Sequence, residues 1–78
     1  MLFRSTPEKR RKLAASLLLA TLCDADNILR QAAAESLGRL GEQRAEPALQ
    51  RALRDTDSSV RRAAEAALVE LQQTRDAQ

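Results

Sequence analysis

The sequence has no histidine, tryptophan or tyrosine, and Phe3 is its one aromatic residue. Without histidine it lacks the commonest general base and the commonest metal ligand, so we expect no activated nucleophile, no metal site and no cofactor. A single cysteine, Cys23, excludes an intramolecular disulfide and suits a reducing compartment, so a cytoplasmic location is expected. The shortage of aromatic and β-branched residues argues against β-strands.

Glycine and proline are also rare, with two of each. Leucine and alanine supply most of the apolar content; both favour helices, and alanine lets helices approach closely. With 78 residues the chain makes one small domain. Its main apolar stretch, residues 13–20, is too short to span a bilayer, so no membrane insertion is expected.

The net charge of +2 is unevenly distributed. Residues 1–12 carry five basic side chains against Glu8, a charge of +4, whereas the remainder carries eight arginines against ten acidic residues. This basic tail is compatible with binding to nucleic acid, which we keep as a hypothesis. No aromatic residue interleaves with it for base stacking, so a solvated tail is the simpler interpretation.

The chain repeats itself with a period of 31 residues, which is typical of stacked supersecondary units. Residues 24–40 and 55–71 give the clearest match. The aligned pairs are Asp24/Asp55, Asp26/Asp57, Leu29/Val60, Arg30/Arg61, Ala32/Ala63, Ala33/Ala64, Leu37/Leu68 and Leu40/Leu71, with Ala14/Ala45, Leu18/Leu49 and Leu22/Leu53 upstream.

Capping residues place four helices within the two repeats. Pro7 begins the first helix with Thr6 as N-cap, Asp26 caps the second helix, Gly41 ends it, and Pro47 lies in the first turn of the third. The predicted fold is all-α, with two antiparallel hairpins that stack. We expect a disordered or non-native lead at residues 1–6, a repeat domain at 7–72 with hairpins at about 7–41 and 44–72, and a frayed polar tail at 73–78.

Apolar residues recur at helical spacing and predict the core. The expected stripes are Leu13, Leu17, Leu18 and Leu22; Leu29, Ala32, Ala33, Leu37 and Leu40; Ala45, Ala48, Leu49, Ala52 and Leu53; and Val60, Ala63, Ala64, Ala67, Leu68 and Leu71.

The first helix is apolar on most of its sides. Four of its residues align with polar residues of the third helix: Ala15, Leu19, Ala20 and Cys23 with Glu46, Gln50, Arg51 and Arg54. A terminal repeat is expected to have a polar outer face instead. We interpret these four apolar residues as a face that packs against a preceding repeat, a second copy of the chain or a partner. The alternative is that local curvature of the helices buries them within the chain.

Each second helix follows an Asp-x-Asp turn and carries an arginine in its first turns. These residues are Asp24, Asp26 and Arg30 in one repeat and Asp55, Asp57 and Arg61 in the other. A guanidinium can bind a carboxylate through two hydrogen bonds, so we expect structural turn–arginine pairs rather than a ladder of ligand-binding arginines. Helix capping explains the aspartates, whereas a calcium loop would need a glycine and a bidentate glutamate.

Four features of the sequence together resemble the short HEAT-like repeat. They are the Asp-x-Asp turn, the arginine followed by alanines, the Leu-Gly-x-Leu-Gly at 37–41 and the Arg-Ala-x-Pro-Ala-Leu at 44–49. Repeats of this kind occur in phycobilin lyase subunits and many bacterial scaffold proteins. The resemblance covers roughly residues 13–71. It implies an α-solenoid with right-handed superhelical stacking, whose second helices line a concave partner-binding surface, and it implies no activity.

The resemblance favours a protein–protein interaction scaffold or adaptor with a protein partner, and not an enzyme acting alone. Such a chain would be a C-terminal fragment of a longer HEAT-repeat protein or an oligomerising small solenoid. The alternatives are a non-catalytic subunit of a bilin-lyase-like modifying enzyme and a nucleic-acid binder that acts through the basic tail. The predicted partner-binding ridge consists of Ile28, Gln31, Glu35, Ser59, Arg62 and Ala66.

Overall fold

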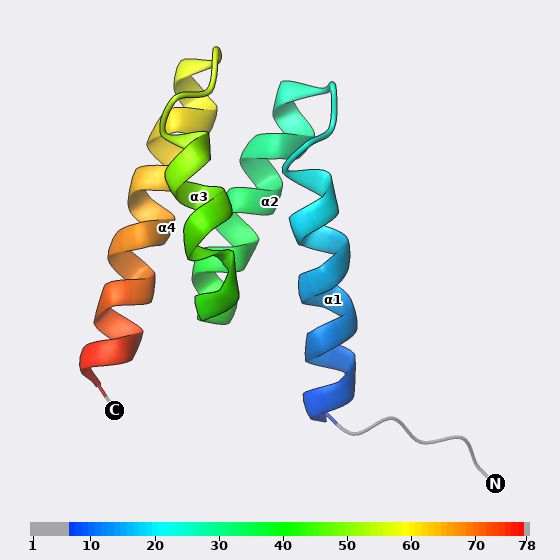
Figure 1. The fold of residues 1–78 in the computed structure, drawn as a ribbon, viewed down its shortest axis with the longest axis vertical. Helices are drawn as coiled ribbons and strands as arrows, with labels where there is room; N and C mark the ends of the chain where they lie inside the picture. Colours follow the sequence, from blue (N-terminus) through cyan, green and yellow to red (C-terminus); the bar gives the residue numbers. More distant parts are fainter. Residues whose placement is uncertain (1–6, 78) are drawn as a thin grey trace, which may run out of the picture.

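The computed structural model describes residues 7–77, and the expected lead at 1–6, with its Thr6 cap, lies outside them. The described residues form α1 (Pro7–Thr21), α2 (Asn27–Leu40), the short 3₁₀ helix η1 (Gln43–Ala45), α3 (Glu46–Ala52) and α4 (Ser58–Asp76). α1 and α2 make hairpin one, and η1, α3 and α4 make hairpin two (Figure 1). The predicted all-α stack of two helical hairpins is confirmed.

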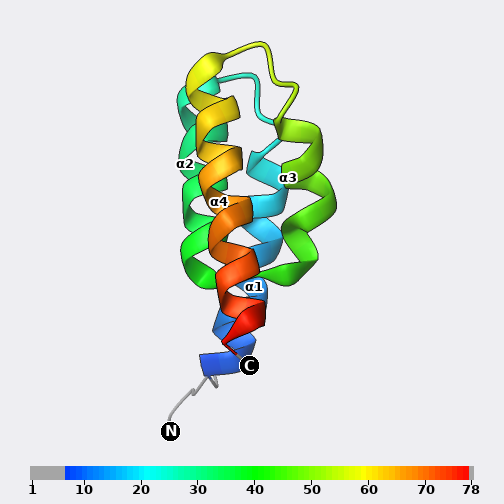
Figure 2. The same ribbon diagram turned by 90° about the vertical axis from the view of Figure 1, so that its left-hand side faces the viewer.

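The helices lie in two layers, with α2 and α4 in one layer and α1 and α3 in the other (Figure 2). The contact between the hairpins is made chiefly by α2 and α4. The turns before these two helices lie at the same end of the molecule (Figure 1). The two second helices therefore run side by side, and their sides facing away from α1 and α3 form one shared surface.

Short-range caps define the ends of α2 and α4, as the sequence predicts. The Asp26 carboxylate accepts the N–H of Ile28 at 2.8 Å. The Asp57 carboxylate accepts two N–H groups in the first turn of α4, at 2.8 and 3.1 Å. Gly41 ends α2 with a φ of 68°, a left-handed conformation that glycine adopts without steric cost.

The core lies mainly between α2 and α4 and is built from small side chains. The predicted stripe of α4 is buried, with only Leu68 half-exposed. On α2 the buried side is rotated from the predicted one, because hairpin two covers a different part of the helix. The buried residues of α2 are Ala33, Ala34, Leu37 and Gly38, while Leu29 and Ala32 are exposed.

The prediction for α1 is only partly confirmed: Leu18 and Leu22 pack against the core as expected, and other residues do not lie where they were predicted. Leu13 and Leu17, expected in the core, are 65% and 71% exposed. Ala15, expected on an outer face, is fully buried, and Leu19 packs against the core. The reason is that α1 is apolar on most of its sides, so periodicity does not select its inward side, and hairpin two lies on the side of Leu19.

The polar segment after Leu71, expected to fray, continues α4 to Asp76. The Arg75 guanidinium lies 2.9 Å from the Glu46 carboxylate at the start of α3. The Gln43 amide donates to the carbonyl of Leu71 at 3.0 Å. These contacts with η1 and α3 supply partners for the last turns of α4, which the sequence pattern does not reveal.

Candidate functional site: the groove between α2 and α4

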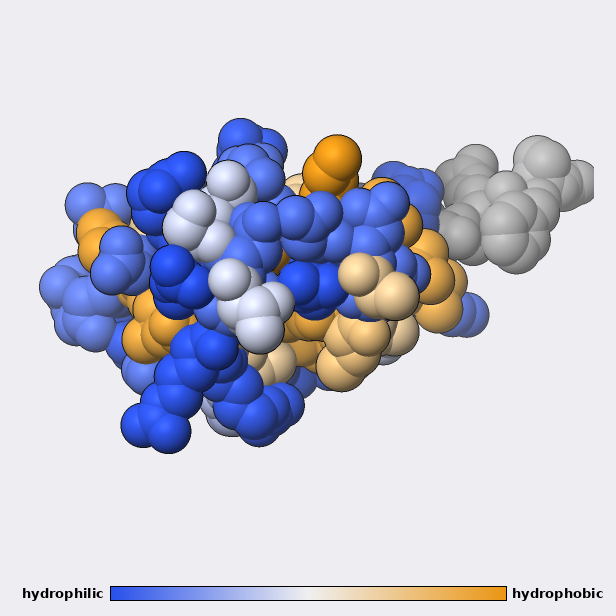
Figure 3. Space-filling model, turned by 90° about the horizontal axis from the view of Figure 1, so that it is seen from above, coloured by the Kyte–Doolittle hydropathy of each residue, from blue (hydrophilic) through white to orange (hydrophobic). Residues whose placement is uncertain are grey.

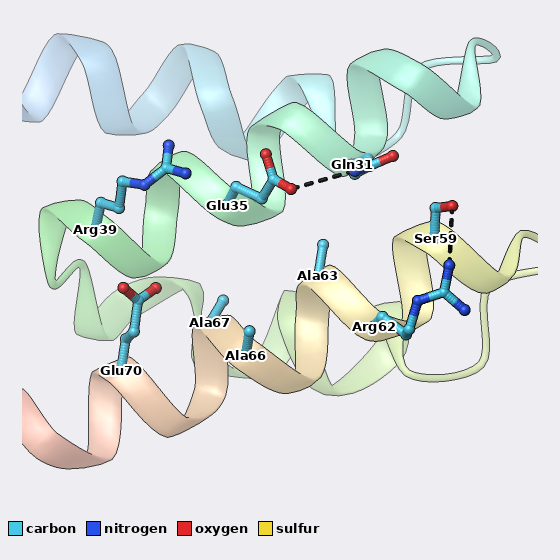
Figure 4. Close-up of a pocket in the computed structure, with 9 residues that line it drawn as sticks. All are labelled: Gln31, Glu35, Arg39, Ser59, Arg62, Ala63, Ala66, Ala67 and Glu70. Carbon is cyan, nitrogen blue, oxygen red and sulfur yellow. Dashed lines mark hydrogen bonds between the residues drawn. The ribbon is translucent and has the colours of Figure 1, made fainter.

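The shared surface of the two second helices holds a groove of about 370 Å³ (Figure 4). Ala63 and Ala67, both buried, form its base. Longer polar side chains from both helices stand along its rims. The lining residues are Gln31, Glu35 and Arg39 from α2 and Ser59, Arg62, Ala63, Ala66, Ala67 and Glu70 from α4.

Hydrogen bonds along each helix hold part of the rim in place. On α2, the Gln31 amide donates to the Glu35 carboxylate at 3.2 Å. On α4, the Arg62 guanidinium donates to the Ser59 hydroxyl at 3.4 Å (Figure 4). Both bonds join residues one turn apart, so the side chains lie along the groove and leave its alanine base open.

The charges of the groove are balanced. Along α2 the groove presents the negative Glu35 and then the positive Arg39. Along α4 it presents the positive Arg62 and then the negative Glu70, so the two helices carry their charges in opposite order. Arg39 and Glu70 lie at the same end of the groove (Figure 4). A surface with two cations and two carboxylates suits a partner that carries both signs of charge. A polyanion would instead require an excess of basic side chains.

Nothing in the groove lining resembles a catalytic set. The Ser59 hydroxyl has a guanidinium as its neighbour, and arginine stays protonated and cannot act as a base. Among residues 7–77 there is no cluster of three or more metal-ligating side chains. The arrangement can therefore bind through hydrogen bonds, charge pairs and shape.

Five of the six predicted ridge residues line the groove, and Ile28, 70% exposed at the start of α2, does not. The sequence interpretation missed Arg39 and Glu70, together with the alanines of the base. The helical spacing could have found both, because Arg39 lies four residues after Glu35 and aligns with Glu70 under the 31-residue shift.

An arginine of hairpin one holds the turn of hairpin two. The Arg30 guanidinium binds both carboxylate oxygens of Asp55, each at 2.9 Å, with side chains only 15% and 13% exposed. It also donates to the carbonyls of Asp24 and Ala25, at 2.9 and 3.0 Å. The hydrogen bond from Arg30 holds the pKa of Asp55 below its ordinary value, and the same bond raises the pKa of Arg30. The pairing thus crosses from one repeat to the next.

The remaining turn residues bind main-chain and amide groups. The Arg61 guanidinium donates to the carbonyl of Asp55 at 2.7 Å. The Asn27 amide donates to the Asp57 carboxylate, and this bond, followed by those from the N–H groups of α4, lowers the pKa of Asp57. Asp24 accepts the N–H of Asp26 at 2.8 Å. Of these contacts, the Asn27–Asp57 bond joins the start of α2 to the start of α4, and the other two hold each turn in place.

The residues predicted to form a missing-repeat face are dispersed. Ala15 is buried and Ala20 is exposed. Leu19 and the exposed Cys23 line a second groove, of about 260 Å³, opposite Ala48 and Ala52 of α3. Two of the four residues therefore face hairpin two of the same chain.

A protein-family model described as HEAT repeats matches residues 4–78. HEAT repeats generally mediate protein–protein interaction. A search of curated proteins found no match. None of the helices within residues 7–77 is long and apolar enough to cross a membrane.

Proposed function

This chain belongs to the HEAT-repeat family, and we propose that it is a scaffold or adaptor module whose protein partner docks in the groove between α2 and α4. One observation carries the proposal: the groove is built jointly by both repeats, with a rigid alanine base and charged rims. The Arg30–Asp55 pair and the close helix contact hold its two walls at a fixed separation. A preformed surface loses little conformational entropy when a partner binds.

The shape and charge of the groove favour a single segment of a partner protein. The alanine base leaves depth for side chains, as in grooves that accept one amphipathic helix. The rims offer donors at Arg39 and Arg62 and acceptors at Glu35 and Glu70, which match a segment carrying both lysine or arginine and glutamate or aspartate. We therefore expect a partner helix or extended segment with mixed charge rather than a nucleic acid.

Charge reversal on the rims tests the proposal. The tagged chain is first used to capture proteins from an extract of its source organism, and the captured partner is then purified for titration. We expect Arg62→Glu and Glu35→Arg each to raise the dissociation constant of the partner about tenfold or more, because like charges would then face each other across the interface.

The matched control is Arg54→Glu, an equal charge reversal at an exposed position after α3, away from the groove. It should leave the dissociation constant within about twofold, as expected for a surface charge outside the interface. Circular dichroism of each variant checks that helicity is unchanged. If Arg54→Glu weakens binding and the two groove variants do not, the partner binds elsewhere and the proposal is wrong.

A further inference from the structure

The groove between α2 and α4 carries different charges at its two ends. Both helices begin at the same end of the molecule, and we call that end of the groove its first end (Figure 1). Arg62 lies there, level with its repeat equivalent, the uncharged Gln31. Further along lie Glu35, Arg39 and Glu70, which together carry one negative charge. The groove is therefore positive at its first end and negative along the remainder.

Two of these charges have only uncharged partners among the described residues. The Glu35 carboxylate accepts the Gln31 amide at 3.2 Å, and the Arg62 guanidinium donates to the Ser59 hydroxyl at 3.4 Å. Seen from the first end, the molecule is mainly hydrophilic, and apolar side chains gather on the hairpin-one side (Figure 3). Glu35 and Arg62 are thus open to a charged partner, and solvent limits each such ion pair to a modest effect.

Glu70 crosses the other end of the groove. Its carboxylate lies at the place that a Cβ on Gly38 would occupy, so it reaches across to α2. Arg39 lies at the same end, where the two opposite charges offset each other (Figure 4). The ion pairs with a partner are therefore expected at Glu35 and Arg62.

The main chain reinforces the order of the charges. Since α2 and α4 run in the same direction, their dipoles add, with partial positive charge at the first end and partial negative charge at the other. A helix bound in the groove carries a dipole of its own, which is favoured when it runs antiparallel to α2 and α4. The groove therefore distinguishes the two directions of a bound helix.

A helix suits these walls better than an extended segment does. Both walls are α-helices, whose N–H and C=O groups bond within each helix and offer no strand edge to an extended chain. A bound helix satisfies its own main chain. Glu35 lies four positions beyond the level of Arg62, about 6 Å along the helix axis. Side chains four residues apart on a helix have a matching separation.

We propose that the partner segment is an α-helix that lies antiparallel to α2 and α4. It places a lysine or arginine beside Glu35 and, four residues later, an aspartate or glutamate beside Arg62. An apolar residue between these two charges faces the alanine base. This partner class rests on the function proposed above, to which it adds the direction of the partner and the order of its charges.

Two helical peptides of equal composition test the direction. Both are alanine-based and about 18 residues long, enough to form a helix in water. The forward peptide carries a lysine, a leucine for the base and a glutamate four residues after the lysine; in the reverse peptide the lysine and glutamate are exchanged. The reverse peptide is the more stable helix on its own, because glutamate before lysine suits the helix dipole. A preference for the forward peptide would therefore not come from helicity.

NMR titration of the isotope-labelled chain measures both affinities. We expect the forward peptide to have a dissociation constant about threefold lower or more, because its side chains and its dipole both match the groove in one direction. The reverse peptide can match only one of them at a time. Equal affinities, or tighter binding of the reverse peptide, would overturn the proposal.

A nitroxide label at the C-terminus of the forward peptide reports its direction. We expect it to broaden the NMR signals of Ser59 and Arg62, at the first end, more than those of Arg39 and Glu70. Broadening at the other end, or equally at both ends, would show that the helix does not bind antiparallel.

A charge exchange tests the pairing with Arg62. We expect Arg62→Glu to raise the dissociation constant of the forward peptide about tenfold, and a peptide with lysine in place of its glutamate to restore the affinity. Arg54→Glu, outside the groove, is the control and should change it by less than about twofold. If the exchanged peptide does not restore binding, the acidic residue does not lie beside Arg62.

The natural partner separates this proposal from the function on which it rests. If Arg62→Glu and Glu35→Arg weaken its binding but neither peptide binds at about 1 mM, the groove is the interface and the helical partner is wrong. If neither variant affects the natural partner, the proposed function fails and the helical partner fails with it.

Discussion

Gly38 lies where α2 and α4 come closest, and its replacement by alanine sets two known effects against each other. Alanine is the better helix former, by about 1 kcal/mol in a helix interior. A gain in stability is therefore expected if the position is an ordinary turn of α2. The added methyl group, however, points at α4. There it would lie 2.7 Å from the Cα and 2.9 Å from the Cβ of Ala67.

The geometry decides which effect is larger. Ordinary van der Waals contact begins at 3.4 Å. The nearest obstacle is the Glu70 carboxylate, which can rotate away, but the main chain of Ala67 is the next nearest and cannot. The helices must then separate locally by roughly 0.5–1 Å, a gap that forfeits a quarter to a half of each nearby atom–atom attraction. Overpacking of this kind costs about 1–3 kcal/mol. Subtracting the propensity gain, we expect Gly38→Ala to lower the free energy of unfolding by about 1 kcal/mol.

Urea unfolding followed by circular dichroism measures this difference. With a slope of about 1–2 kcal/mol/M, the midpoint should fall by about 0.5–1 M. The control is Val69→Ala, because Val69 occupies the equivalent position on α4 and is 56% exposed. That change should leave stability equal or raise it by about 0.5 kcal/mol. If Gly38→Ala stabilises the protein like Val69→Ala, the close approach of α2 and α4 is refuted.

Three further predictions follow from the polar contacts and the cap. The Asp55 carboxyl has a lowered pKa in the folded protein, so its bond to Arg30 stabilises the fold fully above about pH 4. This stabilisation is lost as the pH falls through the folded-state pKa, because the carboxylate becomes protonated. Asp55→Asn should therefore be less stable at pH 7 and lose less stability between pH 5 and pH 2, which urea midpoints across that range will show. Gly41→Ala should cost about 1–2 kcal/mol in the same assay because of its left-handed φ, and an unchanged midpoint would contradict the cap. Arg75→Ala removes an exposed ion pair with Glu46, so a loss of more than about 1 kcal/mol would count against the solvent-screened character of that pair.

Local signals were sufficient for the helix ends and for most of the groove. Asp26 and Gly41 act within one turn of chain, so their roles follow from residue type and spacing alone. The groove residues follow from the repeat, because stacking places equivalent sides of α2 and α4 next to each other. Arg39 and Glu70 obey the same spacing and could have been included.

Contacts between distant residues were beyond the sequence pattern. Each arginine was expected to hold turn carboxylates. Arg30 does hold one, but it is Asp55, 25 residues later in the next repeat, and the sequence does not single out that partner. Arg61 instead binds the main-chain carbonyl of Asp55. The end of α4 reads as a polar tail, yet it is helical to Asp76, and Arg75 there binds Glu46 of the start of α3. A polar side chain does not show in sequence whether its partner is solvent or another helix. Only the packing of the hairpins resolves these cases.

The comparison of the two repeats identified an asymmetry correctly and assigned it to the wrong surface. Leu19 differs from Gln50 because hairpin two covers Leu19, while the equivalent side of hairpin two remains exposed. The uncovered surface of hairpin one instead contains Leu29, which resembles its buried equivalent Val60. When equivalent positions of the two repeats carry different residue types, the position is covered by another helix in one repeat and exposed to solvent in the other. A side that keeps apolar residues while lying open produces no difference in residue type between the repeats, so the exposure of Leu29 follows only from the packing of the hairpins.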